Sequence, residues 1–222
     1  MVLEEQRWGL RYLLFELVFL GSLLGLALSL LLGTYTSAQL NFLYFAVNLA
    51  AAVWIFRRYL RRSLEDLPNR AVRAVVVALV GYLLYQALNY SLSWLIGRSF
   101  PGFFNVNDAS IGSSAREGFW LMALGTVFLA PAAEELFHRG LIFGSVHRRS
   151  RWLAYLVSTA LFAWIHVSGY LWHYAPLHLA LCFLQYIPGG LVLAWAYEQS
   201  GTIFCPIAIH MAINAVGVLS MR

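Results

Sequence analysis

Four polar side chains lie together inside an apolar stretch of the sequence. Residues 132–140 read AAEELFHRG, with Glu134, Glu135, His138 and Arg139 between the apolar segments FWLMALGTVFLAP and GLIFGSV. A charged side chain at the centre of a membrane costs roughly 2.5–3.5 kcal/mol on insertion scales. These residues therefore need either charged partners or a chemical role.

Helical spacing separates the two glutamates. Residues four apart share a helix face, so Glu135 and Arg139 can pair within one helix, and such a pair is buried more cheaply than either charge alone. Glu134 points about 100° away around the helix, and its i+4 neighbour is His138, to which we assign no role. The spacing predicts one supporting pair and one carboxylate left for chemistry. The alternative is that both glutamates only join neighbouring helices.

Two further apolar segments contain polar groups. The segment FAWIHV contains His166, and PIAIHMAINA contains His210 and Asn214, which are four apart and share a helix face. Each alone could be a packing residue that hydrogen-bonds to a neighbouring helix. At about 1.5 Å of rise per residue, Glu134, His166 and His210 lie about 18, 20 and 13 Å along their helices, near the middle of a core of about 30 Å. We therefore expect one shared site.

This set of groups is suited to amide hydrolysis by activated water. Glu134 with an imidazole can hold and deprotonate water, while His210 and Asn214 are donors suited to an oxyanion. No serine or cysteine lies in a nucleophile motif, so we expect no covalent intermediate. A zinc site of Glu134, His166 and His210 is the alternative, but no H-E-x-x-H motif is present. The sequence predicts no metal and no cofactor.

The composition predicts an all-α polytopic membrane protein, a bundle of about seven or eight transmembrane helices around a buried polar cavity. The 222 residues are 61% hydrophobic and 11% charged, against about 45–50% and 25% in soluble domains. The apolar runs predict spans near residues 9–33, 40–56, 74–96, 118–146, 152–168, 175–197 and 202–219. We expect the sixth to break near Pro188, residues 57–73 to form an arginine-rich linker, and residues 97–117 to form a polar loop.

Charge predicts the orientation and argues against a nucleic-acid partner. All 15 basic residues are arginine, and most lie between apolar runs, as in the cytoplasmic loops of membrane proteins. The N-terminus is therefore predicted to be cytoplasmic, and the C-terminus lies outside if the sixth region crosses once. Cys182 and Cys205 lie in apolar surroundings without metal or redox spacing, and we interpret them as packing residues. Glu16, in the first span, is expected to pair near the surface.

The ordered motifs resemble the CPBP family, which includes CAAX-processing endopeptidases and bacterial bacteriocin-processing or immunity-related proteins. The family pattern EExxxR, FxxxH and HxxxN is present as Glu134-Glu135-LFH-Arg139, Phe162-AWI-His166 and His210-MAI-Asn214. The resemblance covers residues 116–217, a catalytic core within a single transmembrane domain of residues 1–222. Residues 1–115 contain no motif.

The resemblance implies a metal-independent glutamate protease within the membrane. Glu134 would be the base with His166, and His210 with Asn214 would stabilise the oxyanion. Glu135, Arg139 and Phe162 would support them. The implied partners are the lipid bilayer and a membrane-associated protein or peptide, with a prenylated CAAX protein as one candidate, and the implied location is a prokaryotic cytoplasmic membrane. The alternatives are a non-catalytic immunity or adaptor protein and a proton-coupled carrier, although no inverted repeat supports a carrier.

Overall fold

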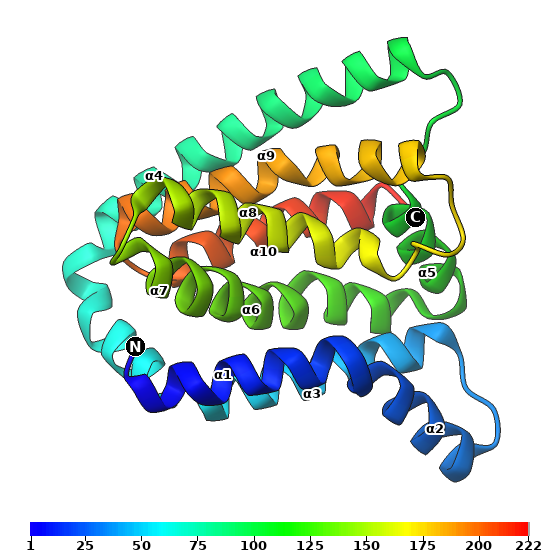
Figure 1. Ribbon diagram of the computed structural model, residues 1–222, viewed down its shortest axis with the longest axis horizontal. Helices are drawn as coiled ribbons and strands as arrows, with labels where there is room; N and C mark the ends of the chain where they lie inside the picture. The colour runs from blue at the N-terminus through cyan, green and yellow to red at the C-terminus, as the bar shows by residue number, and fades with distance from the viewer. Residues whose placement is uncertain (222) are drawn as a thin grey trace.

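The computed structural model describes residues 1–221, which form seven helical segments and contain no strand (Figure 1). The first segment joins α1 (Leu3–Phe15), a π-helical turn η1 (Glu16–Leu20) and α2 (Gly21–Leu32). The next two are α3 (Ser37–Ile55) and α4 (Arg57–Ser99). The fourth joins α5 (Val106–Leu124), η2 (Gly125–Leu129), α6 (Ala130–Glu135), η3 (Leu136–Phe143) and α7 (Gly144–His147). The last three are α8 (Arg151–Ser168), α9 (Pro176–Ser200) and α10 (Phe204–Leu219).

The chain is an all-α polytopic membrane protein, as predicted. Five of the segments are long and apolar enough to cross a membrane, namely Leu3–Leu32, Ser37–Ile55, Arg57–Ser99, Val106–His147 and Pro176–Ser200, and α10 is a shorter apolar helix. Large apolar side chains remain exposed along these helices, among them Leu83 at 67% and Leu30 at 77%. A surface of this kind is stable against lipid chains and unstable in water. The helices therefore bury their polar groups inward and present hydrocarbon outward.

The predicted linker at residues 57–73 is wrong, because these residues form the first part of α4. The helix is 43 residues long and continues through Pro68, so it measures about 64 Å against a hydrocarbon core of about 30 Å. Arginine is a good helix former, and hydropathy marks only the part of a helix that lies in lipid. The predicted loop at residues 97–117 is also shorter than expected, since α5 begins at Val106.

The predicted break at Pro188 is also wrong. Helix α9 is continuous from Pro176 to Ser200, with Pro188, Gly189 and Gly190 all buried in it. Proline removes one backbone hydrogen bond, but packing against neighbouring helices supports such a helix within a membrane. The sixth region therefore runs as one helix, and the two ends of the chain lie at opposite ends of the bundle (Figure 1).

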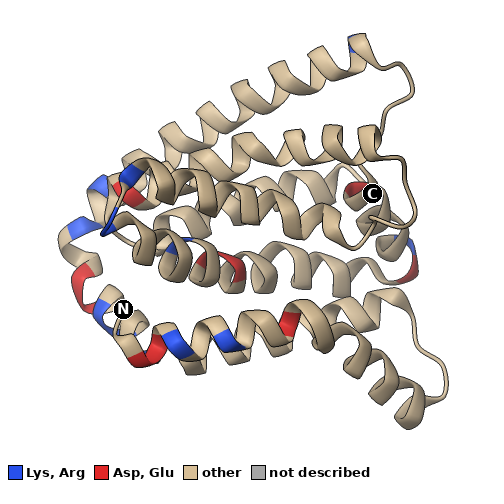
Figure 2. Cartoon of the chain, in the orientation of Figure 1, with Lys and Arg blue, Asp and Glu red and all other residues tan. Residues whose placement is uncertain are grey.

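Charged residues concentrate at the end of the bundle that contains the N-terminus (Figure 2). There Glu5, which is 5% exposed, accepts hydrogen bonds from the backbone N–H groups of Arg58 and Tyr59, both at 3.0 Å. A carboxylate at the first turn of a helix satisfies amides that have no partner within the helix. Helix α1 is thereby fixed to the start of α4.

The fourth segment departs from α-helical geometry on both sides of the two glutamates. The π-helical turn η2 precedes Pro131, and the Ala130 N–H bonds to the carbonyl of Gly125, five residues earlier. The second π-helical stretch, η3, follows Glu135 directly. Proline lacks a backbone N–H and interrupts helical hydrogen bonding, and near Pro131 the interruption takes the form of π-helical turns, which are frequent at functional sites.

Helices α8 and α9 approach closely at Gly190. A Cβ atom built on Gly190 would lie 2.6 Å from Cγ2 of Thr159, whereas one on Gly189 would make only ordinary contacts, 3.6 Å from Tyr85 and 3.7 Å from Phe162. The absence of a side chain at Gly190 therefore fixes how closely the two helices pack.

We predict that Gly190→Ala lowers the free energy of unfolding by about 1–3 kcal/mol, because the added methyl group forces α8 and α9 apart. The matched control, Gly189→Ala, should be neutral or stabilising by up to about 1 kcal/mol, since it only replaces glycine in a helix. Thermal unfolding of the detergent-solubilised protein measures both. Equal effects at the two positions would contradict the packing argument.

Candidate active site

The predicted site residues come from three helical segments that pack together in the middle of the bundle. Helix α6 and η3 contain the two glutamates and Arg139, α8 contains His166, and α10 contains His210. Helix α8 contacts η3, and α10 contacts α6 (Figure 1). Residues separated by up to 80 positions in the sequence therefore meet at one depth, as the helix arithmetic predicted.

The centre of the site is a buried ion pair. Nη1 of Arg139 lies 2.8 Å from Oε1 of Glu135, and both side chains are fully buried. The same oxygen accepts a hydrogen bond from Nδ1 of His210 at 2.9 Å. The pair predicted from i,i+4 spacing is therefore present, and it has a third member on α10 that spacing within one helix could not show.

Arg139 also contacts two other helices. Its Nη2 donates a hydrogen bond to the carbonyl of Gly190 in α9 at 3.1 Å. Its guanidinium carbon lies 4.6 Å above the ring of Phe162 in α8, within the range of a cation–π interaction. One side chain thus connects η3 to α8 and α9. Phe162, predicted as a supporting residue, lies against this cation.

Glu134 differs from Glu135 in both its direction and its partners. Its side chain is 23% exposed, and Oε2 lies 4.0 Å from Nε2 of His210. This oxygen is buried and has no hydrogen-bond partner among residues 1–221. Because Nδ1 of His210 is bonded to Glu135, the other ring nitrogen faces Glu134. The two adjacent glutamates therefore lie on either side of one imidazole.

His166 shares a cavity with Glu134, but no hydrogen bond joins the two within the described residues. Its Nδ1 donates to the carbonyl of Phe162 at 2.7 Å, which leaves Nε2 free. Its ring stacks on Tyr186 at a centroid distance of 4.2 Å. These contacts fix the orientation of the imidazole. Direct contact with Glu134 is made by His210 instead of His166.

Asn214 is held by the π-helical turn that precedes the glutamates. Its Nδ2 donates to the backbone carbonyl of Thr126 at 2.8 Å, and Thr126 lies in η2. The amide carries a second N–H that this bond does not use. His210 and Asn214 therefore reach the same site from one face of α10, as their spacing predicted.

His138, to which the sequence assigned no role, is buried at 2% exposure. Its ring packs edge-on against Phe162 at 5.5 Å, and its backbone carbonyl accepts a hydrogen bond from Ser158 at 3.0 Å. The residue also lines the cavity beside Glu134.

Glu16 lies beside the candidate site, which its sequence context did not predict. It lies in η1 and accepts a hydrogen bond from Tyr44 at 2.6 Å, instead of pairing near the surface with an arginine. It lines the same cavity as Glu134. A carboxylate inside a span was the available signal, but its neighbours depended on how α3 packs.

Two cavities meet at the site. One, of about 480 Å³, contains Glu134, His138, Glu16 and Tyr44 and extends between η1, α3 and α8. The other, of about 300 Å³, contains His210 and extends toward α4 and α9. His166 and Asn214 line both. The described residues thus form the buried polar cavity that the sequence predicted.

The zinc alternative finds no ligand set in residues 1–221. No group of three or more His, Cys, Asp or Glu side chains in this part of the chain is arranged to hold a metal ion.

Residues 116–216 match the sequence profile of a family described as type II CAAX prenyl endopeptidase, Rce1-like. Through these residues the chain is similar to the Rce1-like family. This confirms the resemblance indicated by the motifs, all three of which lie within the matched residues. The Rce1-like family is a protease family, and the similarity fits the integral membrane architecture.

Two curated proteins of Lactococcus lactis subsp. lactis (strain IL1403) are similar to this chain. UPF0177 protein YbdJ is 27% identical over 142 residues, which cover 64% of the chain and 58% of that protein. UPF0177 protein YxdF is 30% identical over 89 residues, which cover 40% of the chain and 44% of that protein. The chain thus spans about half the length of these relatives. No solved structure matches it significantly.

We predict that Arg139→Met destabilises the protein by about 3–5 kcal/mol, because it leaves the buried Glu135 carboxylate without its cation. Arg61→Met is a matched control: Arg61 and Glu65 have the same spacing and a 2.9 Å contact, but their side chains are 82% and 60% exposed. Its effect should stay below about 1 kcal/mol. Unfolding in detergent measures both variants. A comparable loss in the two would show that burial does not govern the pair.

Proposed function

We propose that this chain is a membrane-embedded endopeptidase that hydrolyses a peptide bond of a membrane-associated protein with an activated water molecule. The substrate class to test first is a prenylated CAAX-type sequence, as the family description suggests. The observation that supports the proposal best is the Glu134 carboxylate, which faces a cavity with an unpartnered oxygen beside His210. All other charged groups of the site already have partners.

The proposed chemistry begins with water. A water molecule in the cavity donates one hydrogen to Glu134 and the other to the free Nε2 of His166. Glu134 removes a proton as the oxygen attacks the peptide carbonyl. The same carboxyl group then returns the proton to the leaving nitrogen as the C–N bond breaks. The products are one carboxylic acid and one amine, between which a proton passes to give a carboxylate and an ammonium group, so atoms and charge balance.

The negative charge that forms on the carbonyl oxygen must be stabilised by hydrogen-bond donors. The second N–H of the Asn214 amide is one, and Nε2 of His210, when it carries a proton, is the other. Glu135 supports this role because it accepts the hydrogen bond from Nδ1 and fixes the ring orientation. Glu135 and Arg139 are thus positioning residues, and Phe162 positions both Arg139 and His166.

The proposed setting is a bacterial cytoplasmic membrane with the N-terminus on the cytoplasmic side. Both similar proteins are bacterial, and the arginines gather at the end of the bundle that contains the N-terminus. Positively charged segments are retained on the cytoplasmic side of membranes. If each of the seven helical segments crosses the membrane once, the C-terminus lies on the side opposite the cytoplasm.

We predict that Glu134→Gln lowers kcat for an S-farnesylated CAAX peptide by about 10²–10⁴-fold, because the carboxamide cannot accept the proton of water. KM should change little, since the variant keeps the shape of the side chain. Glu65→Gln, on the exposed part of α4, serves as the control with unchanged turnover. Turnover by Glu134→Gln at the rate of the control would refute the assignment of the base.

We predict that turnover persists after incubation with a strong zinc chelator, because the proposed steps use only protein groups and water. The comparison is kcat of the purified protein before and after chelation, and then after Zn²⁺ is added back. The control is a zinc protease treated in parallel, which should lose activity. Loss of turnover on chelation, with recovery on Zn²⁺ addition, would favour the zinc mechanism.

A further inference from the structure

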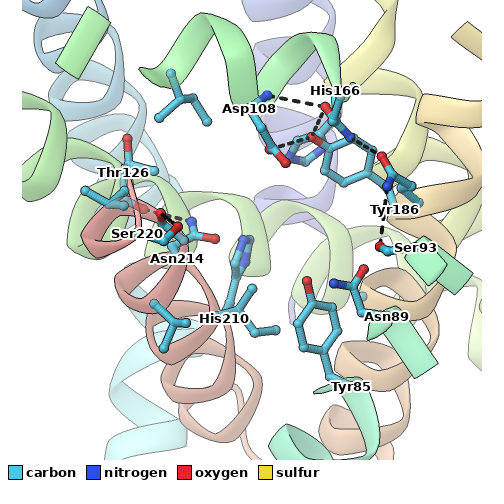
Figure 3. Close-up of a pocket in the computed structure, with 18 of the residues that line it drawn as sticks. Tyr85, Asn89, Ser93, Asp108, Thr126, His166, Tyr186, His210, Asn214 and Ser220 are labelled. Carbon is cyan, nitrogen blue, oxygen red and sulfur yellow. Dashed lines mark hydrogen bonds between the residues drawn. The ribbon is translucent and has the colours of Figure 1, made fainter. Parts of the chain in front are cut away.

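The cavity beyond His210 contains polar groups for which the proposed hydrolysis has no use. It measures about 300 Å³ and lies between α4, α9, α10 and the start of α5. Figure 3 shows Tyr85, Asn89 and Ser93 on one side of this space and His210 and Asn214 on the other. Polar side chains that line it and take no part in the proposed chemistry include Tyr85, Asn89, Ser93, Asn105, Asp108 and Gln185.

Helix α4 supplies a polar stripe to this cavity. Tyr85, Asn89 and Ser93 follow one another at intervals of four residues and therefore share one helix face. The other face of the same helix is apolar and exposed, with Leu83 at 67% and Trp94 at 59%. Such polar residues in a membrane helix either hydrogen-bond a neighbouring helix or face a cavity, and all three of these line the cavity. None of the three lies in the residues that match the family.

The stripe offers hydrogen-bonding groups that the protein leaves unused. Asn105 donates to Gln185 at 2.9 Å, and Gln185 in turn lies 3.4 Å from Ser93. Neither Tyr85 nor Asn89 makes a side-chain hydrogen bond with any residue that the structure describes. The carboxamide of Asn89 has both donors and an acceptor, so its preferred ligand also presents both.

The described lining of the cavity is not suited to anionic ligands. Among residues 1–221 no arginine lines it, and Asp108 is the one carboxylate there. Recognition of a phosphate or a terminal carboxylate normally uses arginine. A ligand that fits is therefore uncharged and rich in both N–H and C=O groups. The backbone of a peptide has this composition, with one donor and one acceptor for each residue.

The dimensions agree with a short peptide segment. Eight residues of helix separate Tyr85 from Ser93, a rise of about 12 Å. An extended chain rises about 3.3 Å per residue, so the stripe matches about three or four residues. One wall of the cavity is formed by His210 and Asn214, which places one end of such a segment beside the catalytic groups.

We propose that the cavity between α4, α9 and α10 binds the extended, uncharged backbone of about three to four substrate residues on one side of the scissile bond. This inference rests on the proposed function and adds the part of the substrate that this cavity recognises. Asn89 and Tyr85 form hydrogen bonds with the peptide groups of the segment. The segment contributes affinity and register, whereas Glu134 and the histidines act on the bond.

The test compares steady-state constants of full-length variants in detergent, with a fluorogenic peptide that ends in an S-farnesylated CAAX sequence. Asn89→Leu and Tyr85→Phe should each raise KM about three- to tenfold, the effect of one lost hydrogen bond, and leave kcat within about twofold. Tyr90→Phe is the matched control, because Tyr90 lies on the same helix but is 74% exposed. Its KM should equal that of the unmodified protein.

N-methylated peptides test whether the backbone is the recognised group. Methylating one amide nitrogen at a time, along the CAAX sequence and the four residues before it, removes single donors without altering side chains. At one position the methyl group should raise KM for the unmodified protein about tenfold but have little further effect on Asn89→Leu, because both changes remove the same hydrogen bond. Independent, multiplicative effects at every position would overturn the proposal.

A binding measurement separates this inference from the proposed function. The affinity of the same farnesylated peptide is measured for Glu134→Gln, alone and combined with Asn89→Leu or Tyr90→Phe. Weaker binding with Asn89→Leu and unchanged binding with Tyr90→Phe support the inference even if no variant cleaves the peptide. Equal affinity in all three overturns it even if the unmodified protein is an active protease. In the kinetic comparison, a fall in kcat with an unchanged KM for Asn89→Leu would also overturn the inference. That result would indicate that the cavity supplies water to the site instead of binding the peptide.

Discussion

The neutralisation of Glu135 by Arg139 and His210 is the interaction on which the arrangement of the site depends. In a low-dielectric interior, a carboxylate without a counter-charge is strongly destabilising, and here one carboxylate oxygen lies within 2.9 Å of both partners. Arg139 further contacts the carbonyl of Gly190 and the ring of Phe162. One set of buried charges therefore fixes four helical segments, and the imidazole of His210 is oriented as part of the same set.

The π-helical turns explain how adjacent residues acquire different environments. Glu134 and Glu135 differ by about 100° around α6, so one faces Arg139 and the other faces the cavity. The turn η2 also places the carbonyl of Thr126 within 2.8 Å of Asn214. A π-helical turn holds one more residue than an α-helical turn. The rotation of α6 relative to α5, and hence the direction of Glu134, depends on that additional residue.

Much of the site was predictable because it rests on spacing within single helices. The Glu135–Arg139 pair, the shared face of His210 and Asn214, and the common depth of the three spans follow from helix geometry. The contact between His210 and Glu135 and the pairing of Glu16 with Tyr44 did not follow, because they depend on the rotation of one helix against another. The errors at residues 57–73 and at Pro188 share one cause. At both places the local composition, arginine-rich or containing Pro and Gly, indicates a break in the helix. In the structure each helix continues, one in the part outside the hydrocarbon core and the other supported by its packing against neighbouring helices.

The continuous helix α4 has a consequence for how such a protein can diversify. The wall of the cavity opposite His210 is built from residues before position 100, whereas the proposed catalytic groups lie within residues 116–216. Substitutions on the inner face of α4 can therefore change the shape and polarity of the cavity without disturbing the buried charges. Under the proposed function, selectivity and reactivity are encoded in separate stretches of the chain, and relatives with the same motifs are free to evolve toward different substrates.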